Sequence, residues 1–541
     1  MNWFWGNNYP YARGSWWPLA AVALMTGGSL AAAELATFET PFFSGAGNCA
    51  FCHDPWNVEP AGEPGQAALL ASDWRATMMA HAFKDPLWRA VMEAEVEDHP
   101  RLKSVIENKC QTCHAPLART QATADGTNEL AFASALTSSL ASEGVGCTLC
   151  HQIQPMNLGT HASFTGHYQI GTNRVIFGPY TNVFTMPMQR HVAYTPVHGA
   201  QVQDSALCAT CHTLFTPILN ETGDSTGEFP EQVPYLEWRN SDYARNGRHC
   251  QDCHMPRLDE AVKVSNRPPW LEPRAPFWKH QFVGGNAFML GLFKANSEQL
   301  KPNAETLQFD RMIAQTRRQL ERAATIAIKG RREDGTLVLL VDVENLSGHK
   351  FPTGHPYRRA WLHLRVNDAA GRILFESGGA DTAGRMREFA GDYAPHYDVV
   401  TKPDQVQIYE AVMGDTAGRV THSLLRAANY LKDNRLPPRG FRPDGSENAH
   451  TAILGAAAQD ANFNAHGSGH DEVTYRVTVN SASGPLVAEV ELLYQSVPPE
   501  AVAHLLQSRG PAAEEFMKLF SSADRQPERV CQSRVMIEEL K

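Results

Sequence analysis

The sequence predicts an α+β protein: a mostly helical, loop-rich domain, then a β-sandwich-like domain and a C-terminal helix. Two observations lead to this prediction. Five copies of Cys-x-x-Cys-His occur between residues 49 and 254, in a stretch rich in Pro and Gly with few long periodic segments. After residue 325 the chain instead contains β-rich and alternating runs, which are typical of strands. A length of 541 residues suggests two or three domains.

The first 33 residues have the features of an export signal. Arg13 supplies positive charge, an apolar stretch follows over residues 16–30, and Ala31-Ala-Ala offers a small-residue cleavage site. A membrane anchor is the alternative, but the apolar run is short for a span. We therefore expect cleavage, a mature chain without a transmembrane segment, and an oxidising location such as the bacterial periplasm.

Residues 34–293, here called the motif domain, contain all five motifs and some local helices. Helices are expected over residues 73–83 and 86–97, with Asp85 as the N-cap of the second. A charged, periodic segment over residues 294–324 then predicts a connecting helix.

Residues 325–497 are predicted to form the β-sandwich-like domain, here called the β domain. A long insertion over residues 400–470 is expected to mix helix and loop. Helix is predicted again over residues 498–541, which would place Cys531 as a buried thiol in a terminal helix. The expected strands lie at residues 336–343, 360–366, 473–479 and 486–494.

The repeated motif has the clearest chemistry in the chain. Cys-x-x-Cys-His is typical of c-type haem attachment: two thiols bond to the haem vinyl groups, and the adjacent His is the proximal iron ligand. Ten of the eleven cysteines are used in this way. We therefore predict five covalently attached haem c groups. The predicted attachment and proximal residues are Cys49, Cys52 and His53; Cys110, Cys113 and His114; Cys147, Cys150 and His151; Cys208, Cys211 and His212; and Cys250, Cys253 and His254.

Two other uses of paired cysteines fit less well. Two Cys-x-x-Cys pairs can make a zinc site with four thiolates, but ten cysteines do not divide into fours. Disulfides are common in exported proteins, yet a bridge between cysteines three positions apart is strained or redox-active. Neither alternative explains why a His follows every pair.

The distal ligands decide whether an iron is closed by two His or open to a substrate. Each His outside the motifs, taken alone, is more often a structural residue than a ligand. His198 and His280 are the strongest candidates in the motif domain, followed by His191 and His81, where Met78 and Met79 compete. The full set considered there is His81, His99, His161, His167, His191, His198, His249 and His280.

His349 is a separate candidate, because it lies in a segment over residues 345–359 that joins two expected strands. This segment is either a well-structured loop or a connection that brings His349 to a haem in the other domain. In the second case Arg358 and Arg359 would neutralise haem propionates. The sequence leaves both readings open.

A formal net charge of −10 argues against general nucleic-acid binding, which requires a basic surface. The charge is compatible with docking to basic patches on redox partner proteins. The sequence contains no feature typical of a hydrolytic triad, a phosphate loop or a dinucleotide-binding fingerprint.

The motif domain resembles multihaem cytochromes c related to hydroxylamine oxidoreductase and its tetrahaem electron-accepting cytochrome. Besides the motifs, the similar segments are Gly144-Val-Gly-Cys-Thr-Leu-Cys-His, Cys250-Gln-Asp-Cys-His-Met-Pro and the residues around His280. The second half is similar to an extension in a bacterial group of multihaem cytochromes c. There the similar segments are Gly348-His-Lys-Phe-Pro-Thr-Gly, Arg358-Arg-Ala-Trp-Leu and Tyr430-Leu-Lys-Asp-Asn-Arg-Leu-Pro-Pro-Arg-Gly.

The resemblance implies covalent haem, mostly bis-His ligation and electron transfer, although related haem arrays also occur in enzymes. Pentahaem nitrite reductases have a motif that ends in Lys, whereas all five motifs here end in His. We expect an exported pentahaem cytochrome that transfers electrons between redox partners. The alternatives are an oxidoreductase with one open haem, acting on a small nitrogen or sulfur compound, and a subunit of a larger respiratory or filamentous assembly.

Overall fold

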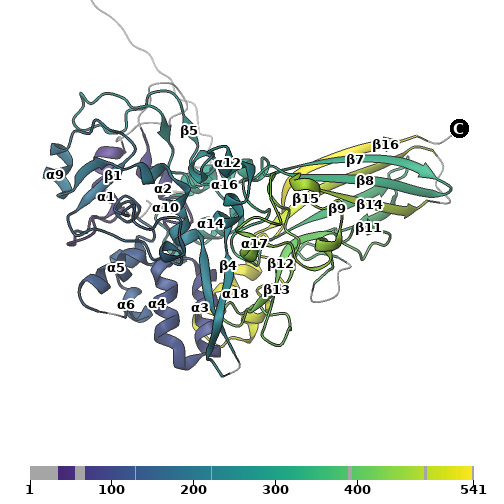
Figure 1. Ribbon diagram of the computed structural model, residues 1–541, viewed down its shortest axis with the longest axis horizontal. Coiled ribbons are helices and arrows are strands. Elements are labelled where there is room, and N and C mark those ends of the chain that lie inside the picture. The colour runs from purple at the N-terminus through teal and green to yellow at the C-terminus, as the bar shows by residue number, and fades with distance from the viewer. Residues whose placement is uncertain are drawn as a thin grey trace, which may run out of the picture.

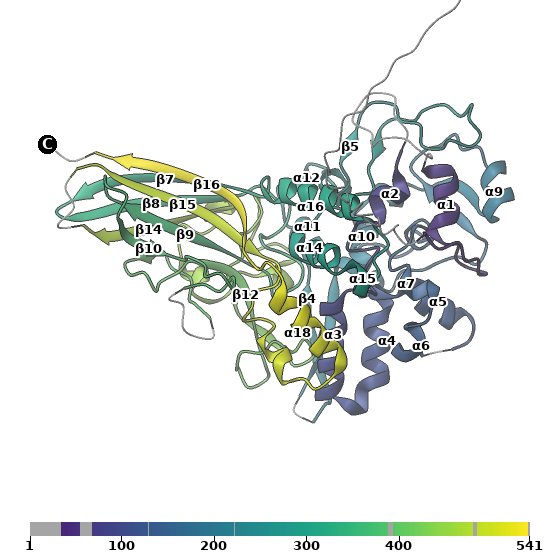
Figure 2. The ribbon, with the colours of Figure 1, turned by 180° about the vertical axis from the view of Figure 1, so that it is seen from behind.

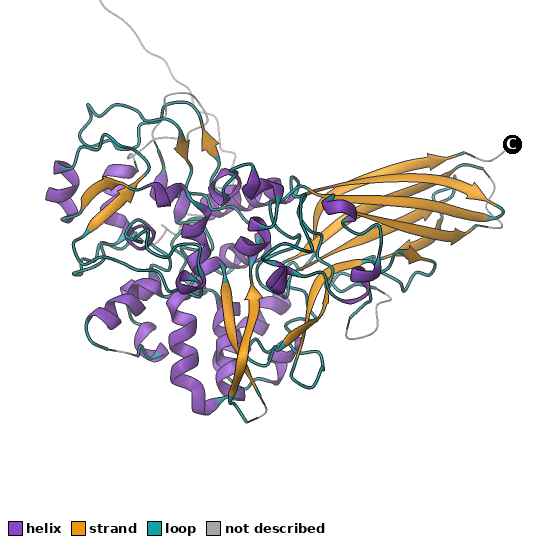
Figure 3. Cartoon of the chain, viewed as in Figure 1, coloured by secondary structure: helices purple, strands orange, loops and turns teal. Residues whose placement is uncertain are grey.

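The computed structural model describes residues 34–54, 68–127, 129–220, 222–387, 393–479 and 484–538. The expected export signal at residues 1–33 lies outside these ranges. Figure 1 shows helices and loops gathered at one end of the molecule and long strands at the other. The same division is seen by secondary structure in Figure 3. The predicted α+β class is confirmed.

Short helices joined by loops build the motif domain. Asp85 caps α3 as predicted, since its carboxylate accepts hydrogen bonds from the N–H groups of Leu87 and Trp88. Val91 and Met92 are buried on one face of this helix. The helices before the connecting helix are α1 (Ala46–His53), α2 (Leu70–Trp74), α3 (Pro86–Asp98), α4 (Lys103–His114), α5 (Pro116–Ala124), α6 (Phe132–Ala135), α7 (Ser139–Ser142), α8 (Cys147–Cys150), α9 (Met186–Val192), α10 (Ser205–His212), α11 (Pro234–Arg239), α12 (Asp242–Arg245), α13 (Cys250–His254), α14 (Ala287–Ala295) and α15 (Ser297–Leu300).

Three two-stranded sheets complete the motif domain, and the expected connecting helix follows as α16 (Thr306–Leu320). A reciprocal capping box between Glu305 and Gln308 starts this helix. Phe309 and Met312 lie on its buried face. The strand pairs are β1 (Val175–Gly178) with β2 (Thr195–His198), β3 (Leu214–Leu219) with β4 (Ser225–Gln232), and β5 (Arg257–Leu258) with β6 (Phe277–Trp278).

Two sheets form the β domain. One has the order β13-β12-β9-β15-β16, with β10 also paired to β9, and the other has the order β11-β14-β8-β7. Alternate residues of β14 are buried, as the period of two in its sequence predicts. The strands are β7 (Ala324–Glu333), β8 (Thr336–Asn345), β9 (Arg359–Asn367), β10 (Ile373–Ser377), β11 (Val399–Val400), β12 (Ile408–Gly414), β13 (Asn429–Asp433), β14 (His470–Thr478), β15 (Leu486–Gln495) and β16 (Glu528–Ile537).

The structure corrects two parts of the predicted β domain. The segment expected to mix helix and loop supplies β12 and β13, as well as the short helix α17 (Asn448–Thr451). The predicted C-terminal helix is shorter than expected: α18 (Pro511–Ser522) is followed by β16, which pairs with β15. Burial in β16 alternates along the strand, and Cys531 is half-buried opposite Leu492. This period of two fits a sheet rather than a helix.

The C-terminal segment returns to the motif domain before it forms the last strand. Figure 2 shows α18 beside α3. The carboxylate of Glu93 on α3 accepts hydrogen bonds from the N–H groups of Ala512 and Ala513 at the start of α18. Glu95 likewise accepts from Ser423 and Leu424 of the β domain. The two domains are therefore joined by partly buried polar contacts as well as by α16.

Candidate haem sites

All five predicted haem motifs have the same local structure. Each Cys-x-x-Cys pair lies on a short helix, and its His either ends that helix or follows it directly. Residues three apart in a helix share one face, so both thiols of a motif project from the same side. The local fold thus places the five predicted proximal His residues in equivalent positions.

A backbone carbonyl holds the Nδ1 atom of four of these five His residues. A metal-binding His characteristically uses its second ring nitrogen in this way, which fixes the ring and leaves Nε2 for the metal. The contacts are His53 Nδ1 to Val264 O at 2.8 Å, His114 Nδ1 to Ala82 O at 3.0 Å, His151 Nδ1 to Phe177 O at 2.7 Å, and His254 Nδ1 to Val283 O.

Burial lowers the pKa of all five motif His residues. The pKa falls to about 4 for His114 and for His212. These rings are consequently neutral at physiological pH, and the neutral imidazole is the form that binds a metal.

His280, predicted as a distal ligand, faces the His of the third motif. The ring centres of His151 and His280 are 6.0 Å apart, and their planes are inclined by 13°. Two imidazoles that bind one metal from opposite sides through bonds of about 2 Å have ring centres roughly 6 Å apart. The Nδ1 atom of His280 lies 3.1 Å from the carbonyl oxygen of Trp278, which leaves Nε2 to bind a metal.

His349 faces the fifth motif in the same manner. Its ring centre lies 6.1 Å from that of His254, with the planes inclined by 20°. The Nδ1 atom of His349 lies 2.8 Å from the carbonyl oxygen of Lys350. The loop thus brings His349 of the β domain to the His of the fifth motif in the motif domain.

His81 does not have the environment expected of a distal ligand, which contradicts the prediction. Its Nδ1 atom is 2.7 Å from the carbonyl oxygen of Thr77, and its Nε2 atom accepts a hydrogen bond from the N–H of Asn303 at 3.0 Å. The ring is fully buried beside Phe293 and Phe309. Both ring nitrogens are engaged, so His81 is a core residue with satisfied hydrogen bonds.

The other two candidates have exposed side chains and lie at the surface of the motif domain. His191 stacks on Phe51 of the first motif at 4.8 Å between ring centres, and its Nε2 atom lies 3.2 Å from the carbonyl oxygen of Asn48. His198 ends β2, where it is paired in register with Gly178. Neither contact identifies a ligand role.

His355 is a half-buried residue that is not among the ligand candidates predicted from the sequence. Burial, then the charge of Arg358, then that of His114 in the second motif, lower the pKa of His355 to about 3. Its ring also packs edge-on against Tyr357, with ring centres 4.3 Å apart. A signal existed in the sequence, because the same loop contains Gly-His twice, at His349 and at His355.

The two arginines of this loop have different roles. Arg358 donates a hydrogen bond to the carbonyl oxygen of Thr353 at 2.8 Å, and its charge contributes to the lowered pKa of His212 and of His254. Arg359 instead belongs to β9 and binds Gln495 and Glu500. The guanidinium of Arg359 is therefore engaged by β15 and by the segment that follows it, and not by the motif domain.

The cysteines are separate from the cluster of the described residues that has metal-binding spacing. All eleven cysteines are unpaired. Among the described residues, which include every motif cysteine, the cluster with metal-binding spacing is His396, Asp460 and Asp471. This cluster contains no cysteine.

Motifs that are distant in the sequence meet in the structure. Thiols of different motifs lie within hydrogen-bonding reach of each other at three places, which link Cys49 with Cys147, Cys113 with Cys211, and Cys208 with Cys250. These contacts join the first motif to the third, and the fourth motif to the second and the fifth. Cys150 of the third motif also interacts electrostatically with Cys211 of the fourth, which connects the two groups.

Comparison with known proteins gives one informative result. No family model matches the chain, and no curated protein matches its sequence. A penta-haem cytochrome c552 from Thermochromatium tepidum has a similar solved structure, with a TM-score of 0.53 and 17% sequence identity. The match covers 91% of this chain and 98% of the cytochrome. What the two proteins share is a fold.

The match extends through both domains, as its coverage of this chain requires. The β domain is therefore part of the shared architecture. In the described ranges, no helix is both long and apolar enough to cross a membrane.

Proposed function

We propose that this protein is an exported pentahaem cytochrome c that transfers electrons between redox partner proteins. The observation that carries the proposal is the pairing of motif and non-motif His rings, His151 with His280 and His254 with His349, at separations of 6.0 and 6.1 Å. Five Cys-x-x-Cys-His motifs and the fold shared with a penta-haem cytochrome support the same conclusion. Bound haem would supply a one-electron iron couple at each motif.

The residues of this chain would hold and tune those groups. The ten motif thiols would anchor them covalently, and the carbonyls that bind Nδ1 would fix the orientation of the proximal rings. His280 and His349 would close two irons to substrates, and His355 would do so at the second motif. Clustering of the motifs would keep the haem groups close together, which favours electron transfer between them.

The β domain would act as a ligand-donating cap, since His349 and His355 both lie in its loop between β8 and β9. Export would follow from the signal expected at residues 1–33, and attachment of c-type haem requires the oxidising side of the membrane. The negative net charge suits partners with basic docking surfaces.

Low-temperature EPR of the fully oxidised holoprotein tests this proposal, with haem quantified as the pyridine haemochrome. Five low-spin haems that do not respond to nitrite, hydroxylamine or cyanide are the expected result. A high-spin haem that shifts on addition of one of these ligands would instead favour an oxidoreductase with an open site. A haem content below five would contradict the attachment proposal itself.

A further inference from the structure

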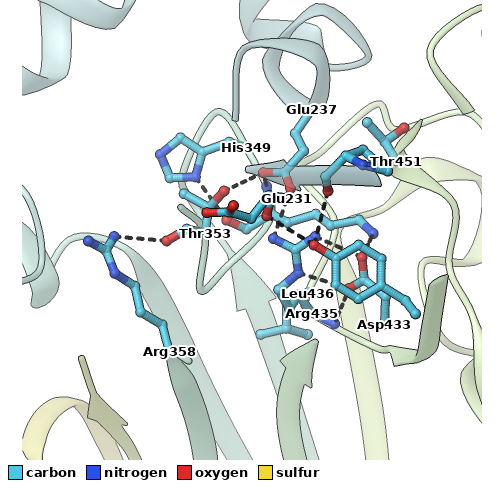
Figure 4. A network of polar contacts seen from close by, with 12 residues as sticks. Glu231, Glu237, His349, Thr353, Arg358, Asp433, Arg435, Leu436 and Thr451 are labelled. Carbon is cyan, nitrogen blue, oxygen red and sulfur yellow. Dashed lines mark hydrogen bonds and ion pairs between the residues drawn. The ribbon is translucent and has the colours of Figure 1, made fainter. Parts of the chain in front are cut away.

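The loop that carries His349 is fastened to the motif domain by a buried set of charges. We name Glu237, Lys350, Asp433 and Arg435 the cross-domain ion network. Glu237 lies on α11 of the motif domain, whereas the other three belong to the β domain. Figure 4 shows these contacts beside His349.

The network contains two cations and two anions, all almost completely buried. Lys350 Nζ lies 2.7 Å from Asp433 Oδ2. The guanidinium of Arg435 binds both oxygens of Asp433, at 2.9 and 2.7 Å, and forms an ion pair with Glu237 at 2.9 Å. Each charge thus has a partner of opposite sign, and the network is neutral overall.

The same network determines where the backbone next to His349 lies. The N–H of Lys350 donates to Glu237 Oε2 at 3.2 Å, and the hydroxyl of Thr353 donates to the same oxygen at 2.5 Å. Glu237 therefore binds the loop directly after His349. From the other side, Asn345 and Ser347 donate hydrogen bonds to the carbonyl oxygen of His349.

Burying charges is costly, and a well-packed apolar substitute for a buried ion pair is often equally stable. A gain in folding stability is accordingly a weak explanation for four buried charges at this place. Positioning of the loop is a better explanation, because ionic contacts fix distances and directions that apolar packing leaves variable. The contacts of Glu237 constrain the residue adjacent to the His349 ring and another residue of the same loop.

We infer that Glu237 and Asp433 are positioning residues, which hold His349 opposite His254 and so maintain the sixth ligand of the fifth haem. This inference rests on the proposed function, because it requires His349 to be a ligand. It adds that Glu237 of the motif domain holds a ligand that belongs to the β domain. Separation of the two domains would therefore remove the sixth ligand from the fifth haem.

Conservative substitutions test this role. Both carboxylates are surrounded by donors, so Glu237→Gln and Asp433→Asn each turn an amide NH₂ group toward another donor. We expect both variants to show a high-spin ferric EPR signal from the haem of the fifth motif. Its intensity should approach one fifth of the total haem. Exogenous imidazole should restore the low-spin spectrum by replacing the displaced His349. A role limited to folding would not produce an imidazole-sensitive signal.

Glu410→Gln is the matched control, since Glu410 pairs with the buried Lys432 at 3.0 Å on β12 and β13. It should leave all five haems low-spin even if it lowers the unfolding temperature. His349→Ala is the reference for complete loss of the ligand. If His349→Ala stays low-spin, the ligand assignment in the proposed function fails, and the inference fails with it.

Suppose instead that one haem is high-spin in His349→Ala, while Glu237→Gln and Asp433→Asn fold and keep all five haems low-spin. In that case only the positioning role is overturned. Should those two variants yield no folded holoprotein, Thr353→Val decides, because it removes one hydrogen bond to Glu237 and no charge. An imidazole-sensitive rise in the high-spin signal of Thr353→Val supports the inference, and an unchanged low-spin spectrum overturns it.

Discussion

His151 and His280 face each other across 6.0 Å, with ring planes only 13° apart. The first residue completes the third motif, whereas the second lies in the segment before α14. Carbonyl oxygens of Phe177 and Trp278 hold their Nδ1 atoms, so Nε2 is the ligand atom left in both rings. This arrangement is the most direct structural support for a bis-His haem.

Replacement of His280 should alter a single haem. In His280→Met a thioether would take the place of an imidazole, and Met ligation raises the reduction potential. We expect one of the five couples to move to higher potential in a spectroscopic redox titration. His280→Ala should instead produce one high-spin haem in the EPR spectrum.

The control for this experiment is His363→Ala, since His363 lies on β9 and binds Glu376 and Glu491 on the β domain. It should leave all potentials unchanged. A shift of all five couples in the His280 variants would point to a general structural change and would contradict a role at one site.

Haem content should follow the number of intact motifs. The double variant Cys250→Ser/Cys253→Ser lacks both anchoring thiols of the fifth motif, so haemochrome analysis should find four haems per chain. Cys531→Ser should retain five, because Cys531 lies on β16 outside the motifs. Loss of haem from the Cys531 variant would show that this thiol has a role that we have not assigned.

Asp471 should make the β domain less stable as the pH rises. Burial raises the pKa of this carboxyl from 3.8 to about 7, although Tyr409 and Gln407 donate hydrogen bonds to it. Because the folded form binds the proton more tightly, its stabilising contribution is complete below pH 3.8 and is lost as the pH rises to about 7. Thermal unfolding across this range measures the effect.

Asp471→Asn removes the titrating group and preserves its shape. Its unfolding temperature should therefore fall less than that of the unaltered protein over the same pH interval. The difference in unfolding free energy is at most about 4 kcal/mol, since one pKa unit corresponds to about 1.4 kcal/mol. Identical pH profiles of the two proteins would exclude Asp471 as the source.

Buried and exposed ion pairs should differ sharply in their contribution to stability. Asp433→Asn leaves the cations of Lys350 and Arg435 buried without the Asp433 carboxylate. The free energy of unfolding should therefore fall by about 3–5 kcal/mol. Glu528→Gln breaks a pair with Arg317, whose side chain is 57% exposed. That change should cost less than about 1 kcal/mol. Chemical denaturation of both holoprotein variants provides the comparison, and equal costs would contradict it.

The sequence was sufficient for features that depend on neighbouring residues. The five motifs lie on single helical turns, and the cap at Asp85 involves residues only two and three positions away. The strands β8, β9, β14 and β15 were likewise predictable from their composition and alternation. The sequence predicts helix over residues 498–541, whereas β16 is a strand because it pairs with β15, which is distant in the sequence.

The distal ligands show what sequence could not decide. His81 and His280 were both candidates, yet His81 meets the N–H of Asn303 and His280 meets His151. His349 reaches His254 because Glu237, from another domain, fixes its loop. The proposed thiol attachment depends on spacing within one helical turn, so the sequence alone predicts it. The sixth ligand is set by long-range packing and by which polar groups remain unpaired, and only the tertiary structure decided it.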